Sequence, residues 1–163
     1  MPLPERLNLS PNGLAILKDI EKFRSKPYRD AAGIPTIGYG HVIKSTERFS
    51  RPITPDEGEA LLKADLETAE NYINATMIGK GSLNGGYRLN QYQYDALVLL
   101  VFNIGAPRFK SSTLLKCLQS GDKAGAAEQF KVWNKITVNG KKQACPGLTA
   151  RRGIERILFT RTA

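Results

Sequence analysis

The side chains in this sequence whose types and spacing best fit acid–base chemistry are two carboxylates, Glu21 and Asp30. On a helix, Glu21 shares one side with Leu14 and Leu17, so we expect it at the edge of the core and partly shielded from water. Partial burial disfavours the charged carboxylate, which suits a general acid near neutral pH. Asp30 precedes a glycine-containing turn, in a polar loop where it should stay ionised. Carboxyl groups in such different environments are typical of an acid and base pair.

Each carboxylate also has an ordinary structural explanation. A glutamate beside an apolar helix face is commonly salt-bridged or extends towards solvent, and an aspartate before a turn is commonly only a turn residue. The pair alone therefore does not establish catalysis. The segment that follows, Thr36-Ile37-Gly38-Tyr39-Gly40-His41, adds a hydroxyl and two glycines that would let a polymer approach the backbone closely.

Capping and breaking signals outline the elements that must position these residues. Ser10-Pro11 predicts the start of a helix that runs through about Arg24. Residues 27–41 alternate strand formers with glycine and proline, which predicts one small hairpin or sheet. A capping box at 54–57 opens a long helix predicted over 55–77. The other predicted elements are a loop over 79–86, a buried central helix over 91–104 that is ended by Gly105 and Pro107, helices over 113–119, 123–133 and 148–159, and a turn over 138–141.

These elements predict a mostly helical α+β fold in a single domain, residues 1–163. A small N-terminal β lobe over about 10–54 would be joined by the connecting helix, 55–77, to a helical lobe over 78–163. Glu21 ends one element and Asp30 lies on the next, and we expect such a junction to form a cleft between the lobes.

Composition limits the possible partners. The 163 residues carry a net charge of +9 with a sequence pI of about 9.7, which favours an anionic partner. The basic residues are dispersed, without an RNA-binding aromatic signature or zinc-finger spacing, so we expect no nucleic acid. Two cysteines, Cys117 and Cys145, and a single histidine make no metal-ligand pattern. We expect free thiols in a reducing compartment, no metal and no cofactor.

Targeting signals are also missing from the sequence. The N-terminus lacks the pattern of a signal peptide, and the longest apolar run, 96–102, is far shorter than the ~20 residues that span a bilayer. We expect synthesis in the cytosol and no membrane insertion.

The arrangement Glu21, eight residues, Asp30, five residues, Thr36 resembles the active-site segment of the phage-type lysozymes, tailed-phage endolysins of glycoside hydrolase family 24. The resemblance extends over about residues 10–160, through segments 96–105, 109–114, 122–133 and 147–155. It implies a lysozyme-like fold and hydrolysis of the β-1,4 bond between N-acetylmuramic acid and N-acetylglucosamine in peptidoglycan.

The resemblance also implies a role for each member of the triplet. Glu21 would protonate the leaving glycosidic oxygen, Asp30 would orient or deprotonate a water and stabilise the oxocarbenium-like sugar, and Thr36 would hold that water. The family is similar to inverting enzymes, so we expect carboxyl groups ~6.5–9.5 Å apart, whereas ~5–5.5 Å would favour a retaining mechanism with Asp30 as nucleophile.

Supporting residues follow from the same resemblance. An arginine of the last helix should pair with Glu21, and Arg152 fits better than Arg151, while Arg24 is a local competitor. His41 is expected to be a structural histidine paired with a carboxylate, not a metal ligand.

Substrate contacts are implied for Phe102, Val42 and Ser112. Phe102 lies in an apolar run, so burial in the core is its alternative. The sole tryptophan, Trp133, reads as core of the helical lobe.

The resemblance further implies a protein that waits in the host cytoplasm, depends on a holin lesion and acts on peptidoglycan in the periplasm. Nothing in the sequence suggests more than a monomer, so we expect a monomer. Two other functions remain open. A lytic transglycosylase would keep Glu21 but would not need Asp30 and Thr36. A non-catalytic cationic module that binds or disrupts the envelope would need neither carboxylate.

Overall fold

The computed structural model describes residues 6–78 and 87–162, which fall into two compact units. One unit comprises Leu14–Glu67, and the other joins the start of the chain to the residues from Thr68 onward. Helices predominate, with two small antiparallel sheets, which confirms the α+β prediction. The loop predicted over 79–86 lies outside the described residues. The lobe limits 10–54, 55–77 and 78–163, and the cleft between the lobes, stay a prediction.

Helix α1, Pro11–Glu21, begins as predicted and ends earlier than predicted. The hydroxyl of Ser10 accepts a hydrogen bond from the Gly13 N–H at 3.0 Å, which confirms the N-cap. The prediction that the helix continues to Arg24 is wrong. Lys22 has a φ of 61°, in the left-handed region that ends helices, and Arg24 already opens strand β1, Arg24–Arg29.

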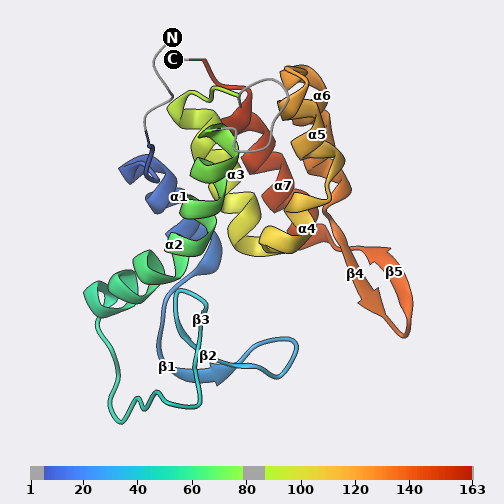
Figure 1. The fold of residues 1–163 in the computed structure, drawn as a ribbon. Coiled ribbons are helices and arrows are strands. Elements are labelled where there is room, and N and C mark those ends of the chain that lie inside the picture. The colour runs from blue at the N-terminus through green and yellow to red at the C-terminus, as the bar shows by residue number, and fades with distance from the viewer. Residues whose placement is uncertain (1–5, 79–86, 163) are drawn as a thin grey trace. The chain divides into compact units, whose positions relative to one another are not determined.

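The smaller unit contains a three-stranded antiparallel sheet in the order β1-β2-β3, with β2 at Pro35–Gly38 and β3 at His41–Val42 (Figure 1). Gly38 has a φ of 68°, and a Cβ added there would lie 3.5 Å from the Cα of Gly58. The close approach that this glycine allows is therefore to the first turns of helix α2, Pro55–Ile78, whose residues up to Glu67 belong to the same unit.

The start of α2 and the buried side chains of the smaller unit follow the predicted pattern. Thr54 and Glu57 form the predicted capping box, in which each backbone N–H donates to the other residue's side chain at 3.1 Å. The large apolar side chains that are buried in this unit are Leu17, Ile37, Tyr39, Ile53, Leu62 and Leu66.

The larger unit is built around helix α3, Gln91–Ile104, which packs against the last helix α7, Pro146–Phe159. Every residue from 94 to 101 is buried, which confirms the prediction of a buried central helix. Asn90 and Gln93 form a capping box at its start, and Gly105, with a φ of 88°, ends it.

Short helices follow α3 along the chain. They are α4 at Ala106–Lys110, α5 at Thr113–Gln119, α6 at Lys123–Gln129 and a 3-10 turn η1 at Phe130–Val132. Helix α5 was predicted with the same bounds. Helix α4 was missed because Pro107 was interpreted only as a stop, whereas a proline is tolerated in the first turn of a new helix.

A second sheet, not predicted from the sequence, is the hairpin of β4, Lys135–Val138, and β5, Lys141–Ala144. Only its turn was predicted; Asn139 and Gly140 have φ values of 51° and 77°, typical of a two-residue hairpin turn. All eight strand residues are exposed, and Figure 1 shows the hairpin projecting away from the helices of its unit. The expectation of one sheet is therefore wrong.

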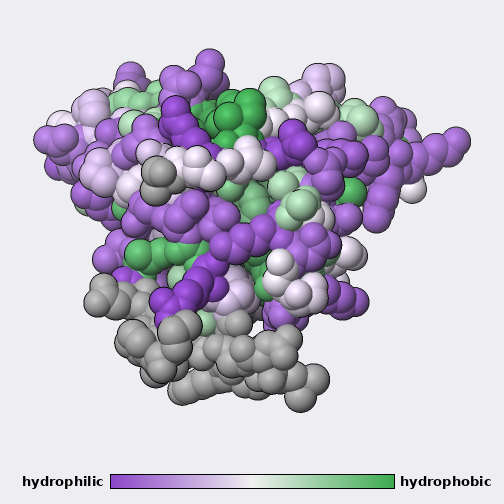
Figure 2. Space-filling view, turned by 90° about the horizontal axis from the view of Figure 1, so that it is seen from above, coloured by the Kyte–Doolittle hydropathy of each residue, from purple (hydrophilic) through white to green (hydrophobic). Residues whose placement is uncertain are grey.

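The surface drawn in Figure 2 is mostly hydrophilic, with apolar patches between charged side chains. Among the described residues, no helix combines the length and the hydropathy that crossing a bilayer requires.

Candidate active site

Glu21 is the last residue of α1 and is half-buried, as predicted for the edge of a core. Its carboxylate lies against the turn between β2 and β3, because a Cβ built on Gly40 would be 3.1 Å from Glu21 Oε2. Gly40 has a φ of 79°. Glycine is therefore favoured here for two reasons: it adopts the positive φ of the turn, and its missing side chain leaves room for the Glu21 carboxylate.

Asp30 follows β1 and organises the turn between β1 and β2. Its Oδ1 accepts hydrogen bonds from the backbone N–H of Ala32 at 2.8 Å and of Ile34 at 2.9 Å. Its own carbonyl accepts from the Gly33 N–H at 2.8 Å. The turn explanation of Asp30 is therefore correct as far as it goes, and both bonds to the carboxylate are accepted by a single oxygen.

Thr36 lies in the central strand β2 and is 3% exposed. Its Oγ1 donates to the carbonyl oxygen of Ile34 at 2.8 Å, and the same carbonyl accepts from the Asp30 N–H at 3.0 Å. Asp30 and Thr36 are thus tied to one peptide group. Val42 is the register partner of Thr36 on β3, and its side chain is exposed.

His41 is buried in β3 between two carboxylates, which confirms the prediction that it pairs with a carboxylate. Its Nδ1 lies 2.8 Å from Asp65 Oδ2, and its Nε2 lies 3.0 Å from Glu47 Oε1. Burial lowers the pKa of His41, but the hydrogen bonds to Asp65 and Glu47 outweigh burial, so its pKa is raised. The Lys44 backbone N–H and His41 together lower the pKa of Glu47.

The arginines predicted to support Glu21 are both buried in α7 and share Glu155. Arg151 Nε lies 3.1 Å from Glu155 Oε2, and Arg152 Nε lies 3.2 Å from Glu155 Oε1. Arg152 also donates to the side chain of Asn103. Burial lowers the pKa of Arg152, and Glu155 opposes that effect. A pairing of either arginine with Glu21 would join the two units and stays a prediction.

Arg24, the local competitor for Glu21, lies on strand β1. Its guanidinium carbon stacks over the Tyr28 ring, 4.5 Å from the ring centroid.

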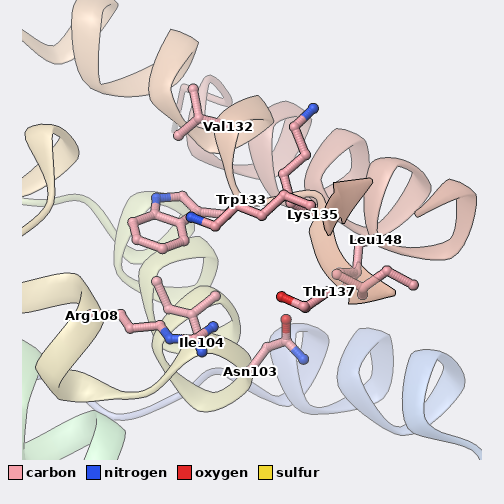
Figure 3. Close-up of a pocket in the computed structure, with 10 residues that line it drawn as sticks. Asn103, Ile104, Arg108, Val132, Trp133, Lys135, Thr137 and Leu148 are labelled. Carbon is pink, nitrogen blue, oxygen red and sulfur yellow. The ribbon is translucent and has the colours of Figure 1, made fainter. Parts of the chain in front are cut away.

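The residues expected to contact substrate have varied surroundings. Phe102 is half-buried on α3, so it is not a fully buried core residue. Ser112 is buried as the N-cap of α5, where its hydroxyl accepts from the Leu115 N–H and donates to the Phe109 carbonyl at 2.6 Å. Trp133 was expected in the core, but it is half-buried and lines a pocket beside β4 (Figure 3).

The triplet Glu21, Asp30 and Thr36 lies in one unit with His41 and Val42, whereas Phe102, Ser112 and Arg152 belong to the other. Sequence reasoning missed the contact of Gly40 with Glu21 and the identity of the partners of His41. No group of three or more metal-ligating side chains occurs in the part of the chain that the structure describes.

Comparison with known proteins gives consistent matches over nearly the whole chain. Residues 18–155 match the phage lysozyme family. The endolysin of Acyrthosiphon pisum secondary endosymbiont phage 1 is 39% identical over 153 residues, which cover 94% of this chain and 98% of that protein.

Solved structures are similar as well. An endolysin from Escherichia coli O157:H7 phage FAHEc1 has a TM-score of 0.85 at 34% identity, with 96% of each chain covered. The muramidase domain of SpmX from Asticaccaulis excentricus has a TM-score of 0.84 at 29% identity, covering 96% of this chain and 100% of that domain. The family match contains the whole Glu21–Thr36 segment and most of both units, and we conclude that this chain belongs to the phage lysozyme family.

Proposed function

We propose that this chain is an endolysin that hydrolyses the β-1,4 bond between N-acetylmuramic acid and N-acetylglucosamine in peptidoglycan. The observation that carries the proposal is the family match over residues 18–155, a range that contains Glu21, Asp30 and Thr36. The similar proteins described above are named as endolysins and as a muramidase. The net charge of +9 supports attraction to an anionic wall polymer.

In the proposed mechanism, Glu21 is the general acid. Its carboxylic proton passes to the glycosidic oxygen as the bond to the anomeric carbon breaks, so the leaving sugar departs with a neutral hydroxyl group. The position of Glu21 at the end of α1 supports this role, because its carboxylate lies against Gly40 in the turn between β2 and β3.

Asp30 and Thr36 act on the attacking water. The Oδ1 of Asp30 is occupied by two backbone N–H donors, so Oδ2 is the oxygen that accepts a water proton. The hydroxyl proton of Thr36 is directed at the Ile34 carbonyl, so its oxygen accepts from the same water. A water that donates to both oxygens turns a lone pair towards the anomeric carbon. Attack transfers its proton to Asp30 and inverts the configuration of the sugar.

The other assignments belong to the same proposal. Arg152, or else Arg151, steadies Glu21, His41 anchors the sheet, and Phe102, Val42 and Ser112 contact the glycan. The protein acts as a monomer and reaches the periplasm from the host cytoplasm after a holin opens the membrane. Co-expression with and without a holin, followed by culture lysis, tests the route, and analytical ultracentrifugation tests the monomer.

The decisive experiment compares wild type with Glu21→Gln on purified Gram-negative peptidoglycan, with the released fragments identified by mass. Loss of the general acid should reduce the rate ~10²–10⁴-fold, and wild type should release reducing muramic ends. Asp19→Asn, which removes an exposed carboxylate from the same helix, is the matched control and should keep wild-type activity.

Two outcomes would replace the proposal. Anhydro-muramyl ends would assign the protein to the lytic transglycosylases, in which the muramyl 6-hydroxyl attacks in place of water. Equal clearance by wild type and Glu21→Gln would leave a cationic module that acts without the carboxylates.

A further inference from the structure

The turn between β1 and β2 is closed by backbone hydrogen bonds around Asp30. The Asp30 carbonyl accepts from the Gly33 N–H at 2.8 Å, and the Asp30 N–H donates to the Ile34 carbonyl at 3.0 Å. Gly33 has a φ of 78°. These features are typical of a three-residue hairpin loop, in which a type I turn is followed by a left-handed glycine. The two backbone bonds do not involve the Gly33 carbonyl, which is left for a side chain.

The side chain of Arg29 binds that carbonyl. Arg29 is the last residue of β1, directly before Asp30, and its Nη1 donates to the Gly33 oxygen at 2.7 Å. The distance is at the short end for an N–H···O bond, as expected when the donor is a cation. Arg29 is exposed and forms no ion pair with Asp30 within the described part of the chain. Its guanidinium is therefore linked to the backbone of the turn and not to the carboxylate itself.

One peptide group connects Arg29 to the Asp30 carboxylate. The Gly33 carbonyl that accepts from Arg29 and the Ile34 N–H that donates to Asp30 Oδ1 at 2.9 Å belong to the same planar unit. Resonance couples the two groups, so a cation bonded to the oxygen makes the N–H a stronger donor. Hydrogen bonds at both ends also fix the direction of the unit. A guanidinium that does not touch the carboxylate can therefore influence how firmly it is held.

We propose that Arg29 is a positioning residue for Asp30 and acts through the Gly33–Ile34 peptide group. The inference rests on the proposed function, in which Oδ2 of Asp30 accepts the water proton. Two N–H donors on Oδ1 restrict rotation of the planar carboxyl group, and this restriction keeps Oδ2 in one direction. Arg29 strengthens one of the two donors. It contacts neither the water nor the sugar in this mechanism, so it is not a catalytic residue.

The size of the effect follows from the second donor. The Ala32 N–H also binds Oδ1, at 2.8 Å, and does not depend on Arg29. Loss of Arg29 should therefore loosen the carboxylate without releasing it. A reacting group that is displaced by a fraction of an ångström reduces the rate of the chemical step, whereas substrate binding depends on other contacts. The loss should appear in kcat and not in KM.

The test compares Arg29→Met with Lys26→Met on soluble, uncrosslinked peptidoglycan strands. Methionine keeps an unbranched apolar side chain but has neither the charge nor an N–H donor. Lys26 is an exposed cation of the same strand, and it forms no hydrogen bond with the turn in the part of the chain that the structure describes. Lys26→Met is therefore a matched control for the loss of charge alone.

Arg29→Met should lower kcat about three- to tenfold and leave KM within about twofold of wild type. Amide hydrogen exchange gives a second readout. Exchange of the Ile34 N–H should accelerate about three- to tenfold, as expected when its peptide group loses one hydrogen bond. Exchange of the Ile43 N–H, which donates to the Pro35 carbonyl at 2.9 Å, should stay unchanged. Lys26→Met should match wild type in kcat, KM and both exchange rates.

Three results would overturn the inference. A raised KM with unchanged kcat in Arg29→Met would make Arg29 a substrate contact. Equal losses of kcat in Arg29→Met and Lys26→Met would indicate a general effect of charge. A change in only one of kcat and Ile34 exchange would separate the peptide group from catalysis.

Failure of the proposed function is distinguishable from failure of this inference. If the chain is not a muramidase, wild type releases no reducing muramic ends, whatever the variants do. If only the inference fails, wild type cleaves normally and Arg29→Met gives one of the three results above. Thermal unfolding of both variants checks that these exposed substitutions leave the fold intact.

Discussion

The two small antiparallel sheets of this protein use their polar side chains in opposite ways. In the first sheet, Asp30 binds backbone N–H groups of its own turn, Thr36 binds the Ile34 carbonyl, and His41 lies between two carboxylates. In the β4–β5 hairpin every strand residue is exposed, and its three lysines have no ion-pair partner among the described residues.

The difference corresponds to what the side chains of each sheet are suited to do. Catalysis depends on geometry, and a displacement of 1 Å can reduce a rate about 10²-fold, so reacting groups need partners that restrict their motion. Attraction between a cation and an anionic polymer declines gradually with distance and tolerates flexible side chains. A tightly bonded sheet is therefore suited to positioning reacting groups, and an exposed lysine-bearing hairpin to a general attraction for anionic polymer.

Among the substitutions that test this difference between the sheets, Gly40→Ala is expected to have the largest effect on activity. The new Cβ would lie 3.1 Å from Glu21 Oε2 and would displace the carboxylate, while the φ of 79° adds backbone strain. The value of kcat on purified peptidoglycan should fall about 10- to 100-fold. Gly140→Ala is the control, because its φ is 77° but no atom lies within 4 Å of the added Cβ. Equal kcat values for both variants would show that the Glu21 carboxylate does not depend on this contact.

The second effect concerns the anchor of the first sheet, His41. Because the folded pKa of His41 is raised above 6.5, its stabilising charge is fully present below pH 6.5 and is lost as pH rises through the folded pKa. The pKa of Glu47 is lowered from 4.5, so its contribution is present above pH 4.5 and is lost as pH falls through the lowered pKa. The stabilisation is therefore greatest between these two values.

Urea unfolding of wild type and His41→Asn at several pH values measures this contribution. The difference in free energy of unfolding should be about 2–3 kcal/mol near pH 5.5 and should shrink at alkaline pH. Lys18→Met removes the ion pair of Lys18 with Glu59 at 2.8 Å, whose partners titrate outside this range. Its effect should stay constant from pH 5.5 to 9. A pH-independent effect of His41→Asn would mean that the imidazole carries no stabilising charge.

The smallest effect on activity is expected from adding the same backbone strain to the turn of each sheet by a glycine-to-alanine substitution. Gly33 and Gly140 have φ values of 78° and 77°, and a Cβ on either would meet no atom within 4 Å. Alanine at each should cost about 1–2 kcal/mol locally. Gly33→Ala should lower kcat, because strain at residue 33 would shift the turn in which its N–H donates to the carbonyl of Asp30. Gly140→Ala should leave kcat on purified peptidoglycan unchanged. A comparable loss of kcat in both variants would contradict the difference between the two sheets.

Elements with strong local signals were predicted well. The capping box at Thr54 and Glu57, the cap at Asn90 and the bounds of α5 depend on residues a few positions apart, which the sequence displays directly. The hairpin was missed although Asn139-Gly140 marked its turn. Its strands are polar, so they lack the alternation of apolar and polar residues that identifies a half-buried strand.

The candidate site divides in the same manner. Spacing and residue type were sufficient to propose Glu21, Asp30 and Thr36 as the catalytic residues, because they lie in one short segment at an unusual spacing. The partners of His41 were not identifiable, since Asp65 is 24 residues away and becomes a neighbour only when α2 packs beside the sheet.

By itself, the sequence determined the family resemblance, the candidate acid–base pair and most of the helices, since these depend on residue type, periodicity and local hydrogen bonding. Only the tertiary structure decided that the Glu21 carboxylate packs against Gly40 and that His41 contacts both Asp65 and Glu47. It also brought cations of three separate elements, Arg108, Lys135 and Lys142, to one pocket. Such groupings arise because packing joins segments that are far apart along the chain, and no local pattern encodes which segments meet.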